Sequence, residues 1–377
     1  MEATSEQRGS REIASLDSTL TGRIPGLDGL RGVSIVVISV AHFSVAQNLA
    51  APEWFRQARF LGGPSVDMFF VISGFLITLL LLREWDREGT ISLSQFFARR
   101  ALRILPAYAA FLVATAFLQP LGVASLGGRG WALALTYTVN FVPHPPAWIG
   151  HVWSLSVEEH FYLVWPLALC LCGRRGALRL LAVAVAGAAA LRFALFRMLS
   201  RDAIDLDLLT LTRMDTIAVG CLLAFLVREP RARPFFEMLR PRATLVALLA
   251  VMMLLASICV FGTSGKYCLL IKRPLEAALF ALVIAACLAN DRSLLRSVLS
   301  CRPLVALGVL SYSLYLWQPL LHPPGNGWPY AWPVNIACAT ACAVISHVCV
   351  ERPCLRCKRW LTTRRDYVIR PALEPSV

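Results

Sequence analysis

The stretch RGVSIVVISVAH, residues 31–42, places ten neutral and mostly apolar residues between an arginine and a histidine. In an α-helix each residue turns about 100° and rises about 1.5 Å, so Arg31 and His42 would share one face, roughly 16 Å apart along the axis. Ionisable side chains are costly inside a bilayer and are therefore candidates for function. The stretch predicts a membrane helix with two functional side chains on one face.

The composition predicts an all-α integral membrane protein. The 377 residues are 57% hydrophobic and 16% charged, with a mean hydropathy of +0.62, whereas soluble domains carry about 25% charged residues. We expect a bundle of about ten transmembrane helices, and we expect the segment 131–143 to form a short buried or interfacial helix. The ten apolar runs lie near residues 30–50, 66–83, 104–119, 153–172, 178–198, 213–227, 243–261, 275–290, 304–321 and 333–350.

The distribution of basic residues predicts that both termini are cytosolic. With this orientation the inner segments hold 26 of the 37 Lys and Arg residues, and the outer loops hold seven, of which Arg273 is one. This asymmetry follows the positive-inside rule, so the net charge of +14 predicts no nucleic-acid partner. We expect a flexible cytosolic segment over residues 1–23, one membrane domain over 24–360 and a basic cytosolic tail over 361–377.

A cluster of three arginines precedes the third apolar run, in FFARRALRILPAY, residues 96–108. Arg99 and Arg103 are spaced i,i+4 and Arg100 and Arg103 are spaced i,i+3, so all three point to one side of a helix. Guanidinium groups in such a cluster suit a phosphate or pyrophosphate. The alternatives are anionic lipid headgroups and the positive-inside rule alone.

Acidic residues and further histidines also lie in or beside the apolar runs. Asp67 lies at the outer end of the second run, Glu158, Glu159 and His160 begin the fourth, and Glu351 ends the last. Each has a structural alternative to a functional role. The Glu158–Glu159 pair could be an ordinary solvated outer surface, and His42 could be satisfied by a neighbouring helix.

Arg213 and Asp215 in RMDTIAVGCLLA, residues 213–224, are more consistent with a structural role. Residues two apart do not face each other on a helix, so we expect both to cap a helix or to pair with other helices. A metal site is not predicted, because the chain has no HExxH motif and the Cys354–Cys357 pair has no second pair with zinc-ligand spacing.

Seven motifs in this order strongly resemble the acyltransferase-3 family of bacterial membrane O-acyltransferases. The resemblance extends from about residue 24 to residue 360. The motifs are LDGLRGVSIVVISVAH (27–42), GGPSVDMFFVISGFLIT (62–78), FFARRALRILPAY (96–108), WSLSVEEHFYLVWPL (153–167), RMDTIAVGCLLA (213–224), LGVLSYSLYLWQPLL (307–321) and VERP (350–353).

The resemblance implies a multi-pass enzyme of the bacterial inner membrane, with ten helices and cytosolic termini. It implies acetyl-CoA, or another acyl-CoA, as a cytosolic co-substrate and no tightly bound cofactor. The expected reaction moves an acyl group, expected to be acetyl, to a hydroxyl of a glycan or glycoside acceptor such as O-antigen or exopolysaccharide. The expected partners are therefore the lipid bilayer, the acyl-CoA and the acceptor, and the oligomeric state stays open.

The resemblance also implies roles for individual residues. His42 and Arg31 map onto the family's Arg-x10-His motif and are expected to be catalytic, together with Asp67 and Glu351. Glu158 and Glu159 are expected to bind the acceptor near the outer surface. The remaining assignments are Arg99, Arg100 and Arg103 for binding CoA, and Tyr312 for binding substrate.

Acyl transfer to a hydroxyl needs a base for the hydroxyl proton and stabilisation of the oxyanion. His42 could deprotonate the acceptor or carry the acyl group covalently, and either Asp67 or Glu351 could orient it. The chain departs from the family at two positions, since His160 stands where many members have Gln and Gln318 where many have His.

The main alternative is a secondary transporter, because intramembrane Asp, Glu and His also form proton relays. Transporters usually have two matching halves with broken helices, and the sequence shows no such internal repeat. A membrane scaffold would explain the hydropathy but not the seven ordered polar motifs.

Overall fold

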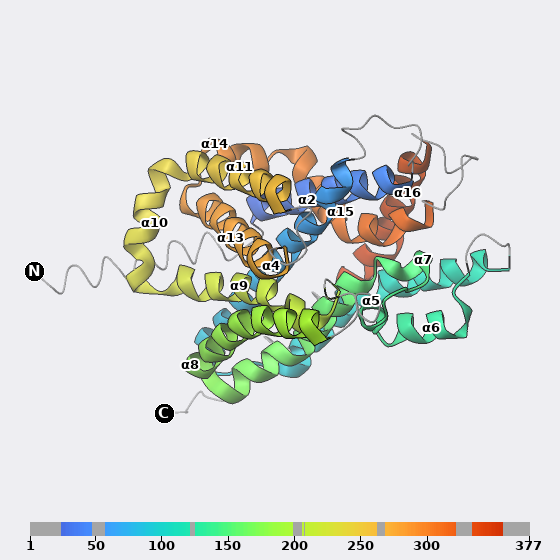
Figure 1. Ribbon diagram of the computed structural model, residues 1–377, viewed down its shortest axis with the longest axis horizontal. Helices are drawn as coiled ribbons and strands as arrows, with labels where there is room; N and C mark the ends of the chain where they lie inside the picture. The colour runs from blue at the N-terminus through green and yellow to red at the C-terminus, as the bar shows by residue number, and fades with distance from the viewer. Residues whose placement is uncertain are drawn as a thin grey trace, which may run out of the picture. The chain divides into compact units, whose positions relative to one another are not determined.

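The computed structural model describes residues 24–46, 57–120, 125–198, 206, 208–261, 268–321 and 334–356. The regular elements in these ranges are all helical and include no strand (Figure 1). The all-α prediction is therefore confirmed for the described part of the chain. The predicted terminal segments 1–23 and 361–377 lie outside the described residues.

Each predicted apolar run coincides with a helix. The nine long helices are α2 (Pro25–Ala46), α4 (Gly62–Glu88), α5 (Leu93–Leu118), α8 (Trp153–Met198), α9 (Thr210–Arg228), α11 (Ala243–Phe261), α13 (Arg273–Ala289), α15 (Arg302–Trp317) and α16 (Val334–Ser346).

Seven helical segments among the described residues are long and apolar enough to cross a membrane. Three features account for the difference from the ten predicted runs. Helix α8 contains two of these runs, and α13 and α15 have only 17 and 16 residues. The number of spans and the cytosolic position of the termini remain predictions.

The break inside α8 lies at Gly173, whose φ of 63° and ψ of 180° are not helical. A residue with a side chain rarely adopts this φ, so glycine allows the chain to bend there. The break falls between the predicted runs 153–172 and 178–198.

Short helices connect the long ones. In place of the predicted helix over 131–143 the structure has α6 (Gly127–Leu135) and a 3-10 turn, η2 (Val139–Phe141). The others are η1 (Ala58–Leu61), α7 (Ala147–Gly150), η3 (Pro230–Ala232), α10 (Arg233–Leu239), η4 (Arg240–Arg242), η5 (Cys268–Lys272), α14 (Leu294–Leu299), η6 (Gln318–Leu321) and η7 (His347–Glu351).

The chain divides into two compact units. Unit 1 comprises Met1–Ile91 and Gly127–Ser311, and unit 2 comprises Ser92–Leu126 and Tyr312–Val377. The boundaries mean that α5 and α16 belong to unit 2, and that α15 begins in unit 1 and ends in unit 2.

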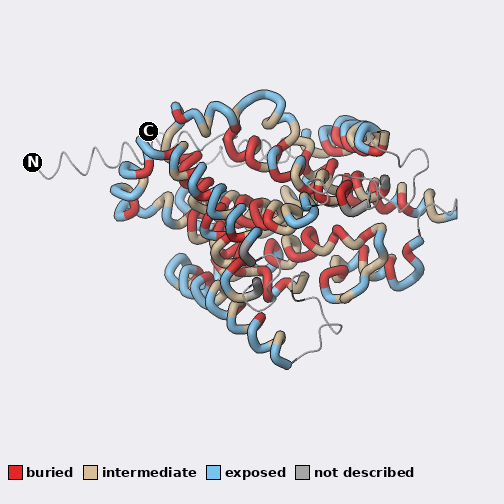
Figure 2. The backbone as a smooth tube through the Cα atoms, turned by 45° about the horizontal axis from the view of Figure 1, so that its top comes forward, coloured by how far each residue is buried: buried red, intermediate tan, exposed pale blue. Residues whose placement is uncertain are grey.

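In unit 1, helix α4 packs against α9, α2 and α13, while α8 packs against α9 and α11 runs along α13. The apolar core includes Phe75 and Leu79 of α4, Ala224 of α9 and Phe280 and Ile284 of α13. Figure 2 shows buried residues along the inward faces of the helices and exposed residues on their outer faces. Helix α4 has buried residues on most of its circumference.

Glycines let α4 and α9 approach each other closely. A Cβ atom added to Gly74 would lie 2.1 Å from the carbonyl oxygen of Ile217, and one added to Gly220 would lie 2.1 Å from that of Val71. Both contacts are with backbone atoms, which cannot rotate away as a side chain can. Small residues at such crossings are typical of helix pairs in membranes.

Glycines also let α2 approach α14 and α15 closely. A Cβ at Gly29 would lie 1.8 Å from the carbonyl oxygen of Leu299, and one at Gly308 would lie 1.8 Å from that of Asp28. The helix that carries Arg31 and His42 is therefore fixed by backbone contacts near its N-terminal end.

In unit 2, helix α5 packs against η7, and α16 packs against η6. The ring of Phe111 on α5 meets the ring of Trp317 edge to face, with centroids 6.3 Å apart. The hydroxyl of Tyr312 donates a hydrogen bond of 2.9 Å to the carbonyl oxygen of Ile104. This bond ties the end of α15 to α5, one residue after Arg103.

We expect Gly220→Ala to destabilise the protein, because the new methyl group would overlap the backbone of α4. Overpacking of this kind costs about 1–3 kcal/mol of unfolding free energy. The matched control is Gly187→Ala in α8, where an added Cβ meets no atom within 4 Å and alanine favours the helix. Thermal unfolding of the purified protein in detergent should show a lower Tm for Gly220→Ala only, and equal Tm values for the two variants would contradict this account.

Candidate functional site

Arg31 and His42 lie on one uninterrupted helix, α2. The helix predicted for residues 31–42 is therefore confirmed, and with it the shared face, since eleven residues complete about three turns. The guanidinium of Arg31 lies over the ring of Phe69, 5.9 Å from its centroid. The catalytic roles of Arg31 and His42 remain predictions.

The start of α4 lies beside the part of α2 that holds His42. A Cβ at Gly62 would be 3.1 Å from the Cβ of Ala41, the residue before His42. A Cβ at the next residue, Gly63, would be 3.8 Å from Nη1 of Arg273. The chain segment around His42 is thus adjacent to the start of α4, and this start is adjacent to the guanidinium of Arg273.

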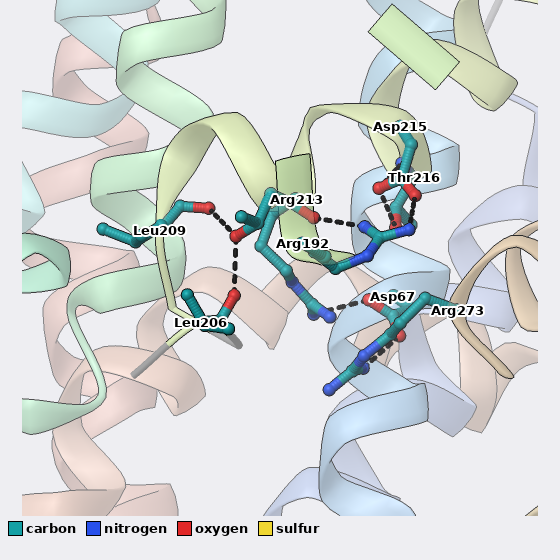
Figure 3. Close-up of polar contacts among 9 residues, drawn as sticks. Asp67, Arg192, Leu206, Leu209, Arg213, Asp215, Thr216 and Arg273 are labelled. Carbon is teal, nitrogen blue, oxygen red and sulfur yellow. Dashed lines mark hydrogen bonds and ion pairs between the residues drawn. The ribbon is translucent and has the colours of Figure 1, made fainter. Parts of the chain in front are cut away.

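Asp67 is the centre of a buried ion-pair cluster in unit 1. Its Oδ1 accepts a hydrogen bond from Nη2 of Arg213 at 2.5 Å, and its Oδ2 accepts one from Nη1 of Arg273 at 2.7 Å. Figure 3 shows the two guanidinium groups approaching the carboxylate from α9 and α13. Asp67 is one of the two carboxylates expected to orient His42, and in the structure each of its oxygens binds an arginine.

A second buried pair joins α8 and α9 close by. Nη2 of Arg192 lies 2.7 Å from Oδ2 of Asp215, and Nη1 of the same guanidinium donates to the carbonyl oxygen of Thr212 at 2.5 Å. The other oxygen of Asp215 accepts the backbone N–H of Thr216 at 2.9 Å. The prediction that Arg213 and Asp215 pair with other helices is confirmed, since their partners lie on α4 and α8.

Aromatic rings complete the environment of Arg213. Its guanidinium carbon lies 5.4 Å from the ring centroid of Phe70 and 5.3 Å from that of Trp153. A cation between aromatic faces gains electrostatic stabilisation that is larger when water is excluded. The side chain of Arg213 is only 2% exposed, so ring contacts and ion pair together compensate for its loss of hydration.

The assignment of Arg273 to an outer loop is wrong. The residue is the first of α13, it is buried, and it pairs with a carboxylate 206 residues away. The apolar run was expected to begin near residue 275, whereas α13 begins at Arg273. Pro274 lies in its first turn, where proline is well tolerated.

The acidic pair at the start of α8 is partly buried. Glu158 accepts a hydrogen bond of 2.8 Å from the hydroxyl of Ser73 on α4. Nδ1 of His160 lies 2.7 Å from the hydroxyl of Thr210, which also accepts a bond of 2.8 Å from Asn140. Glu158, Glu159 and His160 therefore lie where α8 meets α4, α9 and η2. Binding of the acceptor by Glu158 and Glu159 remains a prediction.

In unit 2, the three arginines lie near the start of α5 as predicted. Arg99 and Arg100 are half-buried and Arg103 is exposed. Nη1 of Arg99 donates a hydrogen bond of 3.0 Å to Gln95, one turn earlier. The exposure of Arg103 is consistent with binding a soluble phosphate.

Glu351 lies in a buried polar group of its own within unit 2. Its Oε1 accepts a hydrogen bond from the hydroxyl of Ser313, and its Oε2 lies 3.2 Å from Nδ1 of His347. His347 and Glu351 are the first and last residues of η7, a π-helical turn. Such turns are frequent at functional sites. The sequence interpretation missed both Ser313 and His347, although the i,i+4 spacing of His347 and Glu351 could have indicated their contact.

The predicted residues therefore divide between the two units. Unit 1 holds Arg31, His42, Asp67, Glu158 and Glu159. The residues of unit 2 are Arg99, Arg100, Arg103, Tyr312 and Glu351.

Across the described part of the chain, no group of three or more His, Cys, Asp or Glu side chains could hold a metal ion.

Comparison with known proteins identifies one family over most of the chain. A family model described as an acyltransferase domain, of the acyltransferase-3 type, matches residues 24–351. The peptidoglycan O-acetyltransferase OatA of Listeria monocytogenes is 27% identical over 317 residues, 78% of this chain and 49% of the relative. The O-acetyltransferase OatA of Staphylococcus aureus is 28% identical over 360 residues, 88% of this chain and 57% of the relative.

The chain thus spans about half the length of the relatives that it matches. No solved structure matches it.

We expect Asp67→Asn to be severely destabilising, because it removes the negative charge that pairs with two buried guanidinium groups. Breaking a buried pair in this way costs about 3–5 kcal/mol. Asp86, on the same helix, is the matched control, since it also pairs with two arginines, Arg174 and Arg228, but is 38% exposed. Asp86→Asn should cost less than about 1 kcal/mol.

The measurement is the yield of folded protein and its Tm in detergent for the two variants. If Asp67→Asn and Asp86→Asn lowered the Tm equally, burial would not be what makes the Asp67 cluster important.

Proposed function

This chain belongs to the acyltransferase-3 family, and we propose that it is a membrane O-acetyltransferase that moves an acetyl group from acetyl-CoA to a glycan hydroxyl. One observation carries the proposal. The family match covers residues 24–351, which include every residue expected to act in catalysis, donor binding or acceptor binding. The relatives are named O-acetyltransferases, which supports acetyl as the group and oxygen as the acceptor.

The acceptor in this proposal is a cell-envelope glycan outside a bacterial plasma membrane. The name of the Listeria relative specifies peptidoglycan, which makes peptidoglycan the first acceptor to test, ahead of O-antigen and exopolysaccharide. The carboxylates of Glu158 and Glu159 suit hydroxyl donors of a sugar, since ionised carboxylates accept hydrogen bonds strongly.

In this proposal the arginines of α5 bind the acyl donor, acetyl-CoA. Arg99, Arg100 and Arg103 bind the phosphate groups of CoA, because a planar guanidinium can give two parallel hydrogen bonds to a phosphate. Arg31 stabilises negative charge that develops on the donor. The extended pantetheine arm of CoA is long enough to follow α2 over the roughly 16 Å between Arg31 and His42.

His42 takes the proton in this mechanism. The acceptor oxygen attacks the thioester carbonyl carbon, the C–S bond breaks, and the hydroxyl proton passes to the imidazole and then to the CoA thiolate. In the covalent variant, the imidazole itself attacks the thioester and CoA leaves as the thiol, after which the acceptor hydroxyl takes the acetyl group and its proton returns to the imidazole. Both routes consume one acetyl-CoA and release one CoA thiol for each ester formed.

We expect His42→Ala to lose acetyl transfer by about 10²–10⁴-fold, the usual effect of removing a general base. The matched control is His144→Ala, because His144 is an exposed histidine in the segment before α7 and has no proposed role. The measurement uses purified protein in lipid vesicles, labelled acetyl-CoA outside and a soluble peptidoglycan fragment as acceptor.

Full transfer by His42→Ala with a normal Tm would overturn the catalytic assignment. Uptake of label into the vesicles without formation of an ester would instead favour a transporter.

We expect Arg100→Ala and Arg103→Ala each to raise the KM for acetyl-CoA roughly tenfold while kcat at saturation changes little. The reason is that one charge-assisted hydrogen bond is worth about 1.5–3 kcal/mol, and the phosphates are remote from the reacting bond. Arg87→Ala is the control, since Arg87 is an exposed arginine at the end of α4 that pairs with Glu88. A fall in kcat with an unchanged KM would contradict the donor-binding role.

A further inference from the structure

Three residues of unit 2 have buried polar side-chain atoms that make no hydrogen bond. Nε1 of Trp317, both amide atoms of Gln318 and Oγ of Ser346 have no partner in the part of the chain that the structure describes. The side chain of Gln318 is almost fully buried, with 1% of the residue exposed, and Ser346 is 3% exposed. A buried polar group without a partner is rare and costly, so it indicates a water molecule or a ligand that completes it.

The side chains of Gln318 and Ser346 lie at a similar height along the helices of unit 2. The hydroxyl of Ser313 binds Glu351, and η6, which begins at Gln318, packs against α16. The chain therefore passes through α15 and through α16 in opposite directions. Gln318 comes five residues after Ser313, and Ser346 comes five residues before Glu351, so both lie to the same side of the Ser313–Glu351 contact.

Helix α5 extends to the same height. Its residue Ile104 accepts a hydrogen bond from Tyr312, and the ring of Phe111 meets the ring of Trp317. Helix α5 and the end of α15 therefore run in the same direction. Phe111 follows Arg103 by eight residues, about 12 Å along the helix axis. The arginines proposed to bind the phosphates of CoA thus precede the unpaired side chains along one helix of the same unit.

The unpaired atoms suit a neutral ligand that both donates and accepts hydrogen bonds. The indole N–H and the amide NH₂ group donate, the amide oxygen accepts, and a hydroxyl does either. The two ionisable residues that follow Ser346 on the chain, His347 and Glu351, bind each other. A secondary amide matches this set of atoms, because it has one N–H donor and one carbonyl acceptor and no charge.

We propose that Trp317, Gln318 and Ser346 bind a secondary amide group of a substrate. The amide carbonyl accepts hydrogen bonds from the indole N–H and from the NH₂ group of Gln318, and the amide N–H donates to Oε1 of Gln318 or to Oγ of Ser346. The identity of the ligand rests on the proposed function, in which two molecules carry such amides. They are the pantetheine arm of acetyl-CoA and the N-acetyl groups of a peptidoglycan acceptor, and the place of Arg103 on α5 favours the pantetheine arm.

The test measures the Tm of the full-length protein in detergent with increasing concentrations of three ligands. CoA has both a nucleotide and a pantetheine arm, adenosine 3′,5′-bisphosphate has the nucleotide without the arm, and N,N′-diacetylchitobiose has N-acetyl groups on a sugar. The Tm shift gives an apparent Kd for each ligand, since a ligand stabilises the folded state that binds it.

Three variants each remove polar atoms with little change in volume. They are Trp317→Phe, Gln318→Met and Ser346→Ala. The control is Thr340→Val on α16, because the hydroxyl of Thr340 already donates to the carbonyl oxygen of Ile336. The control should bind all three ligands as the wild type does.

Each of the three variants should weaken the binding of CoA by about two- to tenfold for every hydrogen bond lost. The Kd for the nucleotide should not change, because the nucleotide has no amide. Weaker binding of the disaccharide with an unchanged Kd for CoA would also support the site, and would assign the amide to the acceptor. An equal loss of affinity for CoA and for the nucleotide would overturn the inference.

The unliganded variants provide an independent measurement. Gln318→Met removes an unpaired buried amide, so its Tm without ligand should stay the same or rise. A lower Tm would assign Gln318 to the packing of unit 2 and overturn the inference. Unchanged affinity for CoA and for the disaccharide in all three variants would overturn it while the proposed function stands. If the wild type bound neither of these ligands, the proposed function would fail as well.

Discussion

A single carboxylate, that of Asp67, holds three helices of unit 1 together. It binds Arg213 of α9 through one oxygen and Arg273 of α13 through the other, and all three side chains are almost completely withdrawn from solvent. Removing any one partner would leave a charge in a medium that solvates it poorly. The Arg192–Asp215 pair extends the same principle to α8. Four helices are therefore joined by charge as well as by apolar contact.

Close backbone packing makes the Asp67 cluster geometrically possible. Asp67 and Gly74 are seven residues apart on α4, and Arg213 and Gly220 are seven apart on α9, so ion pair and glycine contact lie on the same face of each helix, two turns apart. The glycines bring the two backbones together, and the ion pair fixes which helices meet. In lipid, apolar side chains favour no particular neighbour, so these two features together specify the partner.

Of the residues predicted to act in unit 1, His42 lies in a segment next to this framework. His42 lies next to Ala41, which packs at Gly62, and the following Gly63 adjoins Arg273 of the cluster. A reaction that passes through an oxyanion and a thiolate benefits from fixed positive charge nearby, and this part of the chain supplies it through residues that the packing already requires. The arginines of α5, which suit a soluble phosphate, belong to unit 2.

The sequence by itself determined the helices. A helix in lipid must satisfy its own backbone hydrogen bonds, so hydropathy along the chain was enough to locate α11 at Ala243–Phe261 and most of the other long helices within about five residues. Helix α5 is an exception, since it begins at Leu93, before the predicted run 104–119. The same local geometry placed Arg31 and His42 on one face and the three arginines on one side of α5. The seven ordered motifs indicated the family, which the match over residues 24–351 establishes.

Only the tertiary structure decided which charges meet. Arg273 stands just before a predicted apolar run, and its partner Asp67 lies 206 residues away. Arg192 and Ser313 were overlooked for the same reason, since Asp215 and Glu351 reach them only through the packing of separate helices. An ion pair between helices depends on the three-dimensional arrangement of the bundle, so it cannot be inferred from the spacing of residues along one helix.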